Sequence, residues 1–388
     1  MRSTSLLRSI VTPVAILRLV LGWGTFFLLL GLGRFLAPPV PGGLLVLALS
    51  VIVAVILLCS FGVVHEAEQL ARRLGDPYGS LVLTLSIVLI EVILISAVML
   101  GPGDHSTIAR DSVMAVSMII MNLVIGLSLL VGGTRHGAMA PNRTGASAYL
   151  AMLVVLTSLA FALPALIGTG GSYTTAQEIP LVLLTVVLYA YLLYRQMGAQ
   201  SGDFIEVDPK VIQRLGIGGT EGQAGGQRTP IGQLLATHRT EVLLRLGLLV
   251  ITVLPIVLLS HDMASLLDDG LGRLGAPVAL SGILIAMIVF LPESITSVRA
   301  ALNGEIQRVS NLCHGALVST VGVTIPAVLV IGMLTGQSVV LGESPANLLL
   351  LGLTLLMTVA GFGAKRVTAV HGAAHLALFV VYGLVVFA

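Results

Sequence analysis

The chain has 388 residues, of which 56% are hydrophobic and only 10% are charged. A soluble domain carries about 25% charged residues, because its surface must be polar. This composition excludes a soluble globular protein and indicates a membrane protein whose main partner is the lipid bilayer. The formal net charge is only +2, and the basic residues are scattered. A nucleic-acid partner is therefore not expected.

Apolar runs of about 20 residues recur along the chain, and a helix of that length crosses the hydrocarbon core of a bilayer. The first run follows two basic residues but precedes no small-residue cleavage site, so we interpret it as a retained span. The longest connection is rich in Gly, Gln and Thr and predicts a flexible linker. The runs predict eleven spans, at about 14–33, 43–64, 79–100, 112–133, 147–168, 179–195, 242–260, 277–300, 311–335, 346–364 and 370–387.

The distribution of basic residues predicts the orientation of these spans. Sixteen of the twenty Lys and Arg residues fall on the side of the membrane that holds the N-terminus, and three fall on the other side. Lys and Arg accumulate in cytoplasmic loops. We therefore expect a multi-pass protein of the cell inner membrane, with a cytoplasmic N-terminus and a periplasmic C-terminus.

Short sequence patterns recur about 200 residues apart, which indicates an internal repeat. Arg73–Pro77 matches Arg273–Pro277, and Ile108–Ser112 matches Ile306–Ser310. Each half holds five spans, so the second half is inverted relative to the first, as in many transporters. The predicted fold is an all-α polytopic membrane protein with eleven transmembrane helices, in two inverted five-helix repeats plus one extra N-terminal helix. The predicted divisions are the extra helix at 1–38, the first repeat at 39–197, a cytoplasmic linker at 198–240 and the second repeat at 241–388.

Two matching spans each contain a single carboxylate, Glu91 in the third span and Glu293 in the eighth. An acid at mid-span costs about 2.5–3.5 kcal/mol on insertion scales, so such residues usually face a partner, a cavity or a pathway. Two facing carboxylates hold protons when the site is empty and release them to a divalent cation. We expect both glutamates to bind the cation, as metal ligands, and the proton. The alternative is a protonated glutamate that serves helix packing alone.

A hard cation such as Ca²⁺ takes six to eight oxygen ligands, more than two carboxylates supply. Pro292 leaves the backbone carbonyl of Ile288 without its usual helical donor. For each Ser or Thr candidate, the alternative is a hydrogen bond back to its own helix. The additional candidate ligands are Asn122, Thr84, Ser86, Ser294, Ile288, Ser319 and Thr320.

Other polar groups cluster near the ends of spans. His65, Glu66 and Glu68 lie where the second span meets the cytoplasm and are candidates for an access funnel; the alternative is an ordinary interfacial loop. The pattern is not a zinc-protease HExxH motif, because Gln69 replaces the second histidine. Candidates for proton relay, with packing as the alternative, are Asn311, His314, His371 and His375.

Several stretches resemble bacterial ChaA-type calcium/proton antiporters, which belong to the Ca²⁺:cation antiporter superfamily. Residues 65–79, continuing to Glu91, are similar to the first signature of that family. The resemblance covers nearly the whole chain and implies ten core helices in two inverted repeats, one extra N-terminal helix, and essential acids at Glu91 and Glu293. The other similar stretches are Ala109–Asp111 with Asn122, 292–326 and Gly372–Phe379.

The chain also departs from its relatives, which often carry Gly-Asn shortly before each acid. This chain has Thr84-Leu85-Ser86 and Ala286-Met287-Ile288 at those places. The family's linker is often acidic, whereas the linker here balances acids with bases. We therefore carry over the two glutamates but neither the remaining ligand set nor a calcium-sensing role.

These observations predict a secondary active transporter that exchanges cytoplasmic Ca²⁺ for external protons by alternating access and needs no cofactor. Na⁺/H⁺ or K⁺/H⁺ antiport through the same site is the main alternative, because members of this branch also exchange those ions. An intramembrane enzyme is disfavoured, because the chain has neither GxSxG nor HExxH. A channel is disfavoured by the inverted repeat. Ion stoichiometry and oligomeric state stay open.

Overall fold

The regular structure of the described chain consists of helices. The structure is a computed structural model that describes residues 10–33, 36, 39–74, 88, 91–93, 95, 96, 99, 106–198, 200–215, 231–277 and 279–387. In these ranges β pairing is limited to isolated bridges, such as the one between Met139 and Val367. The expected all-α class is confirmed.

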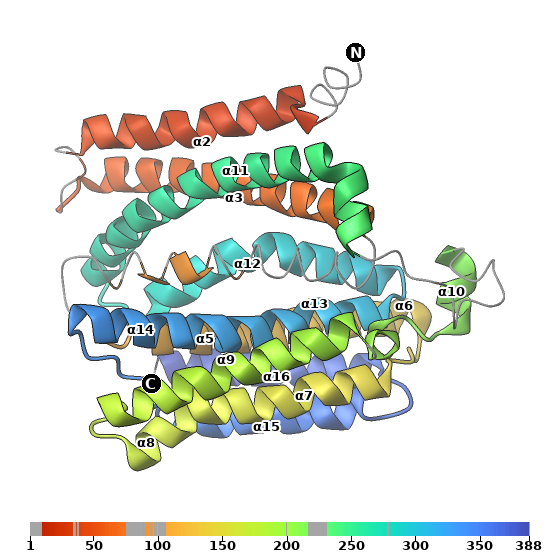
Figure 1. Ribbon diagram of the computed structural model, residues 1–388. Helices are drawn as coiled ribbons and strands as arrows, with labels where there is room; N and C mark the ends of the chain where they lie inside the picture. Colours follow the sequence, from red (N-terminus) through yellow and green to blue (C-terminus); the bar gives the residue numbers. More distant parts are fainter. Residues whose placement is uncertain are drawn as a thin grey trace. The chain divides into compact units, whose positions relative to one another are not determined.

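The helices fall into two compact units (Figure 1). The smaller unit contains α2 (Pro13–Leu32), α3 (Gly42–Leu74) and α11 (Ile231–Arg273). The larger unit contains α5 (Ile108–Met118), η1 (Ile119–Val124), α6 (Ile125–His136), α7 (Arg143–Thr157), η2 (Ser158–Ala162), α8 (Leu163–Ile167), α9 (Thr175–Met197), η3 (Ser201–Phe204), α10 (Pro209–Leu215), α12 (Ala279–Leu302) from Gly282 onward, α13 (Ile306–Ser319), η4 (Thr320–Thr324), α14 (Ile325–Thr335), α15 (Pro345–Phe362) and α16 (Ala369–Val386).

Nine helices in the described ranges are long and apolar enough to cross a membrane, and the bent helix α12 makes ten. Each corresponds to one of the expected spans. The remaining expected span, 79–100, lies largely outside the described residues. A multi-pass protein is therefore confirmed, whereas the count of eleven stays a prediction.

In the smaller unit, α2, α3 and α11 pack side by side (Figure 1). The Thr12 side chain accepts the backbone N–H of Ala15 and caps α2, and Pro13 suits the first helical turn because its missing N–H would have no partner there. Trp23 Nε1 donates to the carbonyl of Ile251 in α11, at 3.2 Å. This bond ties the extra N-terminal helix to α11.

Two helices of the smaller unit are longer than the apolar pattern predicts. Helix α3 continues to Leu74, so His65, Glu66 and Glu68 lie on a helix rather than in a loop. Helix α11 continues to Arg273. Its last turns carry charged side chains, so the apolar run ends before the helix does. There the Asp269 carboxylate pairs with Arg273, one helical turn away, and Asp269 also accepts the backbone N–H of Val40.

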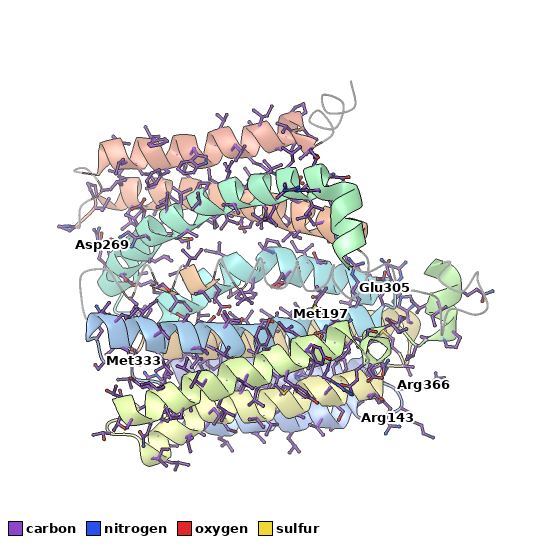
Figure 2. The ribbon with its side chains drawn as sticks, in the orientation of Figure 1. Arg143, Met197, Asp269, Glu305, Met333 and Arg366 are labelled. Carbon is purple, nitrogen blue, oxygen red and sulfur yellow. The ribbon has the colours of Figure 1, made fainter. Side chains whose placement is uncertain are left out.

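In the larger unit, backbone contacts group the loops at two opposite ends. At one end, Met139 pairs with Val367, and Arg143 Nε donates to the carbonyl of Gly363. In Figure 2, Arg143, Arg366 and Glu305 gather at this end, whereas Met333 lies at the other. This grouping matches the alternation of loops that the predicted spans require.

At the other end, three loops are hydrogen-bonded to one another. The N–H of Val340 donates to the carbonyl of Ser106, and the N–H of Leu341 donates to the carbonyl of Gly171. Arg110 Nη1 donates to the carbonyl of Gly342, at 3.2 Å. These are the loops that the predicted layout places together on the periplasmic side.

The helices that start at Ile108 and Ile306 are interrupted in the same way. Each changes to a π-helical segment, η1 at Ile119–Val124 and η4 at Thr320–Thr324, and then returns to α-helix. Asn122 lies fourteen residues after Ile108, and Thr320 lies fourteen residues after Ile306, so the two residues match in the repeat. Segments of π-helix are rare overall, but those that occur are frequently at functional sites. Their repetition therefore directs attention to these two residues.

The first part of the predicted linker is ordered. Residues Ser201–Phe204 form η3, and Pro209–Leu215 form α10. The carbonyl of Phe204 accepts Asn311 Nδ2, and Glu206 Oε2 accepts the N–H of Gln307. The expectation of a flexible linker is therefore wrong for this part, because its polar groups are bound to α13. Residues 216–230 lie outside the described chain.

Helices α6 and α16 approach each other closely because glycine lies at their crossing. A Cβ atom on Gly372 would stand 2.6 Å from the carbonyl oxygen of Gly126 and would also meet the backbone of Leu130. Backbone atoms cannot move aside as a flexible side chain can. The crossing therefore requires glycine at position 372.

We predict that Gly372→Ala destabilises the protein by about 1–3 kcal/mol, the usual cost of overpacking. Thermal unfolding in detergent measures the effect. Gly383→Ala on the same helix is the matched control, because no atom lies within 4 Å of its added Cβ. Equal melting temperatures for the two variants would contradict the proposed crossing.

Candidate cation and proton site

The two glutamates expected from the sequence are both buried in the larger unit. Glu91 is 4% exposed and Glu293 is 8% exposed. Their carboxyl groups lie close enough for the charge of Glu91 to act on Glu293. The structure thus brings together the two carboxylates that the sequence places about 200 residues apart.

Thr320 makes the direct contact with Glu91. Its hydroxyl, in η4, donates to Glu91 Oε2 at 2.6 Å, and the residue is fully buried. The second oxygen of the same carboxyl group, Oε1, is buried without a hydrogen-bond partner. A buried carboxylate oxygen without a donor is costly. This oxygen is therefore a ready acceptor for a proton or a cation.

Asn122, which matches Thr320 in the other half of the chain, is also fully buried. Its Nδ2 donates to Thr354 Oγ1 at 2.8 Å, and its Oδ1 lies 3.1 Å from Nδ1 of His375. Helices α15 and α16 supply these partners. The amide is therefore held on both sides rather than left to rotate.

The remaining hydroxyl candidates differ in their partners. Ser294 donates to the carbonyl of Phe290 in its own helix, as commonly occurs for serine within a helix. Ser319 is hydrogen-bonded to the hydroxyl of Tyr189, at 2.8 Å. Thr84 and Ser86 lie outside the described residues. Among the hydroxyl candidates in the described chain, Thr320 is the one bonded to a site carboxylate.

Helix α12 bends between Ile288 and Phe290, shortly before Pro292. Its two parts, Leu280–Ile288 and Phe290–Leu302, meet at 56°. Proline has no N–H to give to the carbonyl four residues earlier, which is that of Ile288. The bend therefore leaves the Ile288 carbonyl available as an oxygen ligand one turn before Glu293.

His65, Glu66 and Glu68, near the end of the second span, have different environments. His65 is exposed, and Glu68 is half-buried. Glu66 is buried, and its Oε2 accepts Arg245 Nη1 at 2.7 Å. Arg245 also donates to Glu241 Oε1, at 3.2 Å. Glu66 is thus held in an ion pair between α3 and α11.

Among the described residues, no group of three or more His, Cys, Asp or Glu side chains is arranged to hold a metal ion. Cys59 and Cys313 are free and buried. The arrangement around Glu91 and Glu293 instead combines two carboxylates with neutral oxygen donors. Such a set suits a hard cation that binds weakly enough to be released.

Two supporting residues were not among the predicted ligands. Thr354 is fully buried on α15 and accepts the Asn122 amide. A possible signal was the pair Thr354 and Thr358, one turn apart in an otherwise apolar span. For His375 the sequence indicates proton relay, with packing as the alternative. Its contact with Asn122 depends on the α6–α16 crossing, which the sequence alone does not reveal.

Comparisons with known proteins agree with this fold. The sequence model of the sodium/calcium exchanger protein family matches residues 44–198 and 244–388. The putative ionic transporter y4hA of Sinorhizobium fredii is 36% identical over 327 residues, with 83% of each chain covered. The sodium-potassium/proton antiporter ChaA of Escherichia coli is 31% identical over 333 residues, covering 86% of this chain and 87% of ChaA.

Among solved structures, the Ca²⁺/H⁺ antiporter protein YfkE superposes with a TM-score of 0.63 at 15% identity, covering 96% of this chain and 98% of that one. At this identity the likeness shows the fold alone. The family and the relatives that match this chain are ion transporters rather than enzymes, and the chain is therefore a transporter. The chain belongs to the sodium/calcium exchanger protein family, within the Ca²⁺:cation antiporter superfamily.

We predict that Arg245→Ala destabilises the protein strongly, by about 3–5 kcal/mol, because it removes the guanidinium group that pairs with the buried Glu66 carboxylate. Thermal unfolding in detergent measures the loss. Arg239→Ala is the control, because Arg239 is exposed on the same helix. If the two variants have equal melting temperatures, the ion pairs of Arg245 contribute no stability.

Glu343 is a further buried carboxylate, in the loop before α15. It is 6% exposed, and its Oε2 accepts the N–H of Ser344 and Nδ2 of Asn347. Its Oε1 is buried without a partner. Burial raises the pKa of the Glu343 carboxyl group above its ordinary value. The two hydrogen bonds and the charge of Arg110 lower this pKa, and the charge of Asp111 raises it, but burial has the largest effect.

A raised folded-state pKa means that the folded protein binds this proton more tightly than the unfolded chain does. The corresponding stability is present at acid pH and is lost as the pH rises through the folded-state pKa. We therefore predict that Glu343→Gln melts at a higher temperature than the wild type at neutral pH, and that the difference vanishes in acid. A variant that melts lower at neutral pH would show that the charged form is the favoured one.

Proposed function

We propose that this protein is a cation/proton antiporter in which Glu91 and Glu293 bind the transported cation and the protons alternately. The observation that carries the proposal is the burial of both carboxyl groups in the same unit, within electrostatic range of each other. Two neighbouring carboxyl groups in a medium of low dielectric cannot both stay ionised without compensation. Protons or a cation must supply that compensation.

The exchange follows from the competition between these two ligands. Protons neutralise the pair from one side of the membrane, and a cation replaces them from the other. The loaded site is electrically compensated in either state. The transporter can therefore change the side to which the loaded site opens at low cost in both states. Inverted-repeat transporters expose a midplane site to the two sides in turn.

Neutral oxygens complete the proposed cation site. Thr320 Oγ1 contacts Glu91, and the Ile288 carbonyl is released by Pro292 next to Glu293. Asn122 Oδ1 is the third candidate, from the matching π segment. Thr84 and Ser86 keep their predicted roles as further ligands. With both carboxylates, these groups approach the six to eight oxygens that Ca²⁺ takes.

We infer that Ca²⁺ is the exported cation and that it leaves the cytoplasm as protons enter. One divalent cation balances the two carboxylates, as two protons do. The second candidate is Na⁺ or K⁺ exchange at the same site, favoured by the relative named as a sodium-potassium/proton antiporter. That relative is more similar in sequence than YfkE, so ion choice needs a direct test.

The proposed setting is the cell inner membrane, with the N-terminus in the cytoplasm and the C-terminus in the periplasm. The excess of Lys and Arg on one side supports this orientation. The two ranges that match the family begin and end close to the predicted repeats, 39–197 and 241–388. On this proposal His65, Glu66 and Glu68 lie at the cytoplasmic end of α3, where only exposed His65 and half-buried Glu68 would meet arriving cations.

We predict that Ca²⁺ added to acid-loaded everted vesicles dissipates the pH gradient, and that Glu91→Gln and Glu293→Gln each reduce the response to that of empty-vector vesicles. The reason is that a neutral amide can neither carry the proton nor balance the cation. A fluorescent pH indicator follows the gradient. Glu178→Gln, at the start of α9, is the control and should transport normally.

The same vesicles, tested with Na⁺ and K⁺, decide the ion. A response to Na⁺ or K⁺ without one to Ca²⁺ would replace the first candidate with the second, and both require the glutamates. Full transport of any of these ions by Glu91→Gln or Glu293→Gln would refute the two-carboxylate site. Expression levels in the membrane must be matched for each variant.

A further inference from the structure

Asn122 owes its orientation to two helices from the other half of the chain. Its Nδ2 donates to Thr354 Oγ1 on α15, at 2.8 Å, and lies 3.4 Å from the sulfur of Met118. Its Oδ1 lies 3.1 Å from His375 Nδ1 on α16. Asn122, Thr354 and His375 are all fully buried.

The contact with Oδ1 determines which nitrogen of His375 carries the proton. Because Asn122 Oδ1 can only accept a hydrogen bond, His375 Nδ1 must donate. A neutral ring with its proton on Nδ1 has a bare Nε2. That Nε2 is buried without a partner. The hydrogen bond to Asn122 is therefore the polar contact that orients this imidazole.

The close helix crossing brings the two side chains together. Gly126 lies one turn after Asn122 on the first helix, and Gly372 lies about one turn before His375 on α16. The backbones touch at these glycines, with a Cβ on Gly372 only 2.6 Å from the carbonyl oxygen of Gly126. A wider crossing would move the imidazole out of reach of the amide.

We propose that His375 is a positioning residue for the transported cation, acting through Asn122. The proposal rests on the proposed function, in which Asn122 Oδ1 is a cation ligand. An asparagine amide that rotates by half a turn about its Cβ–Cγ bond exchanges its oxygen for its N–H₂ group, and this group repels a cation. The N–H of His375 opposes this turn, because the turned amide would place a second donor against it. The other tautomer of His375 would accept that donor but would leave an Nε2–H buried without an acceptor. Oδ1 keeps a second lone pair for the cation.

This arrangement is the equivalent of a supporting hydrogen bond to a metal ligand, which orients the ligand and raises its affinity for the ion. Thr354 acts on the other side of the same amide by accepting Nδ2. Thr320, the match of Asn122, is oriented instead by Glu91 itself. The two halves thus orient their neutral ligands by different means.

Two substitutions separate this role from proton relay. His375→Asn places an amide nitrogen near the position of Nδ1, whereas His375→Gln places it near the position of Nε2. We expect His375→Gln to raise the apparent KM for the cation about tenfold, the lower end of the effect of losing a supporting hydrogen bond. His375→Asn should restore an apparent KM close to that of the wild type.

The experiment measures initial rates in everted vesicles against the concentration of Ca²⁺, or of Na⁺ and K⁺ if Ca²⁺ gives no response. Each substitution is made in the wild type and in Asn122→Ala. On the Asn122→Ala background, His375→Gln should add no further increase in KM. Melting temperatures in detergent verify that the variants fold.

An unchanged KM in His375→Gln would overturn the proposal, as would an equal defect in His375→Asn. A lower maximal rate with an unchanged KM, independent of Asn122, would assign His375 to proton relay and would also overturn it. If Asn122→Ala alone leaves KM unchanged while Glu91→Gln abolishes transport, this inference fails and the proposed function stands. Transport by Glu91→Gln would mean that the proposed function itself has failed.

Discussion

An ionised carboxyl group inside a bilayer is unstable unless another charge or a proton compensates it, and the larger unit is organised around two such groups. Glu91 and Glu293 are both buried, and their charges act on each other. The bend before Pro292 and the π segment at Thr320 place oxygen atoms near them where a regular helix would bond those atoms internally. Irregular helices are thus the means by which an apolar span presents polar groups.

The buried ion pairs of the smaller unit obey the same constraint with the opposite result. Arg245 compensates Glu66 and Glu241 permanently, with donor–acceptor distances of 2.7 and 3.2 Å. No exchangeable ion is needed there, so those carboxylates hold α3 and α11 together. On the proposed function, compensation in the larger unit comes from an exchangeable cation or proton. The proposed difference between a structural and a transporting carboxylate is therefore the fixed counter-charge beside the structural one.

Much of this structure follows from the sequence, because apolar runs and single intramembrane acids are strong local signals. The span positions, the all-α class and the burial of Glu91 and Glu293 were predictable on that basis. The ion pair of Glu66 was not, because its partner Arg245 is distant in sequence. The contact of His375 with Asn122 was also hidden, since it depends on how closely two glycine-bearing helices cross.

The neutral residues beside the paired acids are held across the two halves of the chain. Thr320, from after the linker, bonds Glu91, from before it, while Thr354 and His375 hold Asn122 in the reverse direction. Neither half contains a complete set of partners. A chimaera that joins one half to the corresponding half of a distant homologue would break these bonds unless compensating residues were exchanged with it. Such reciprocal dependence restrains the two halves from diverging independently in evolution.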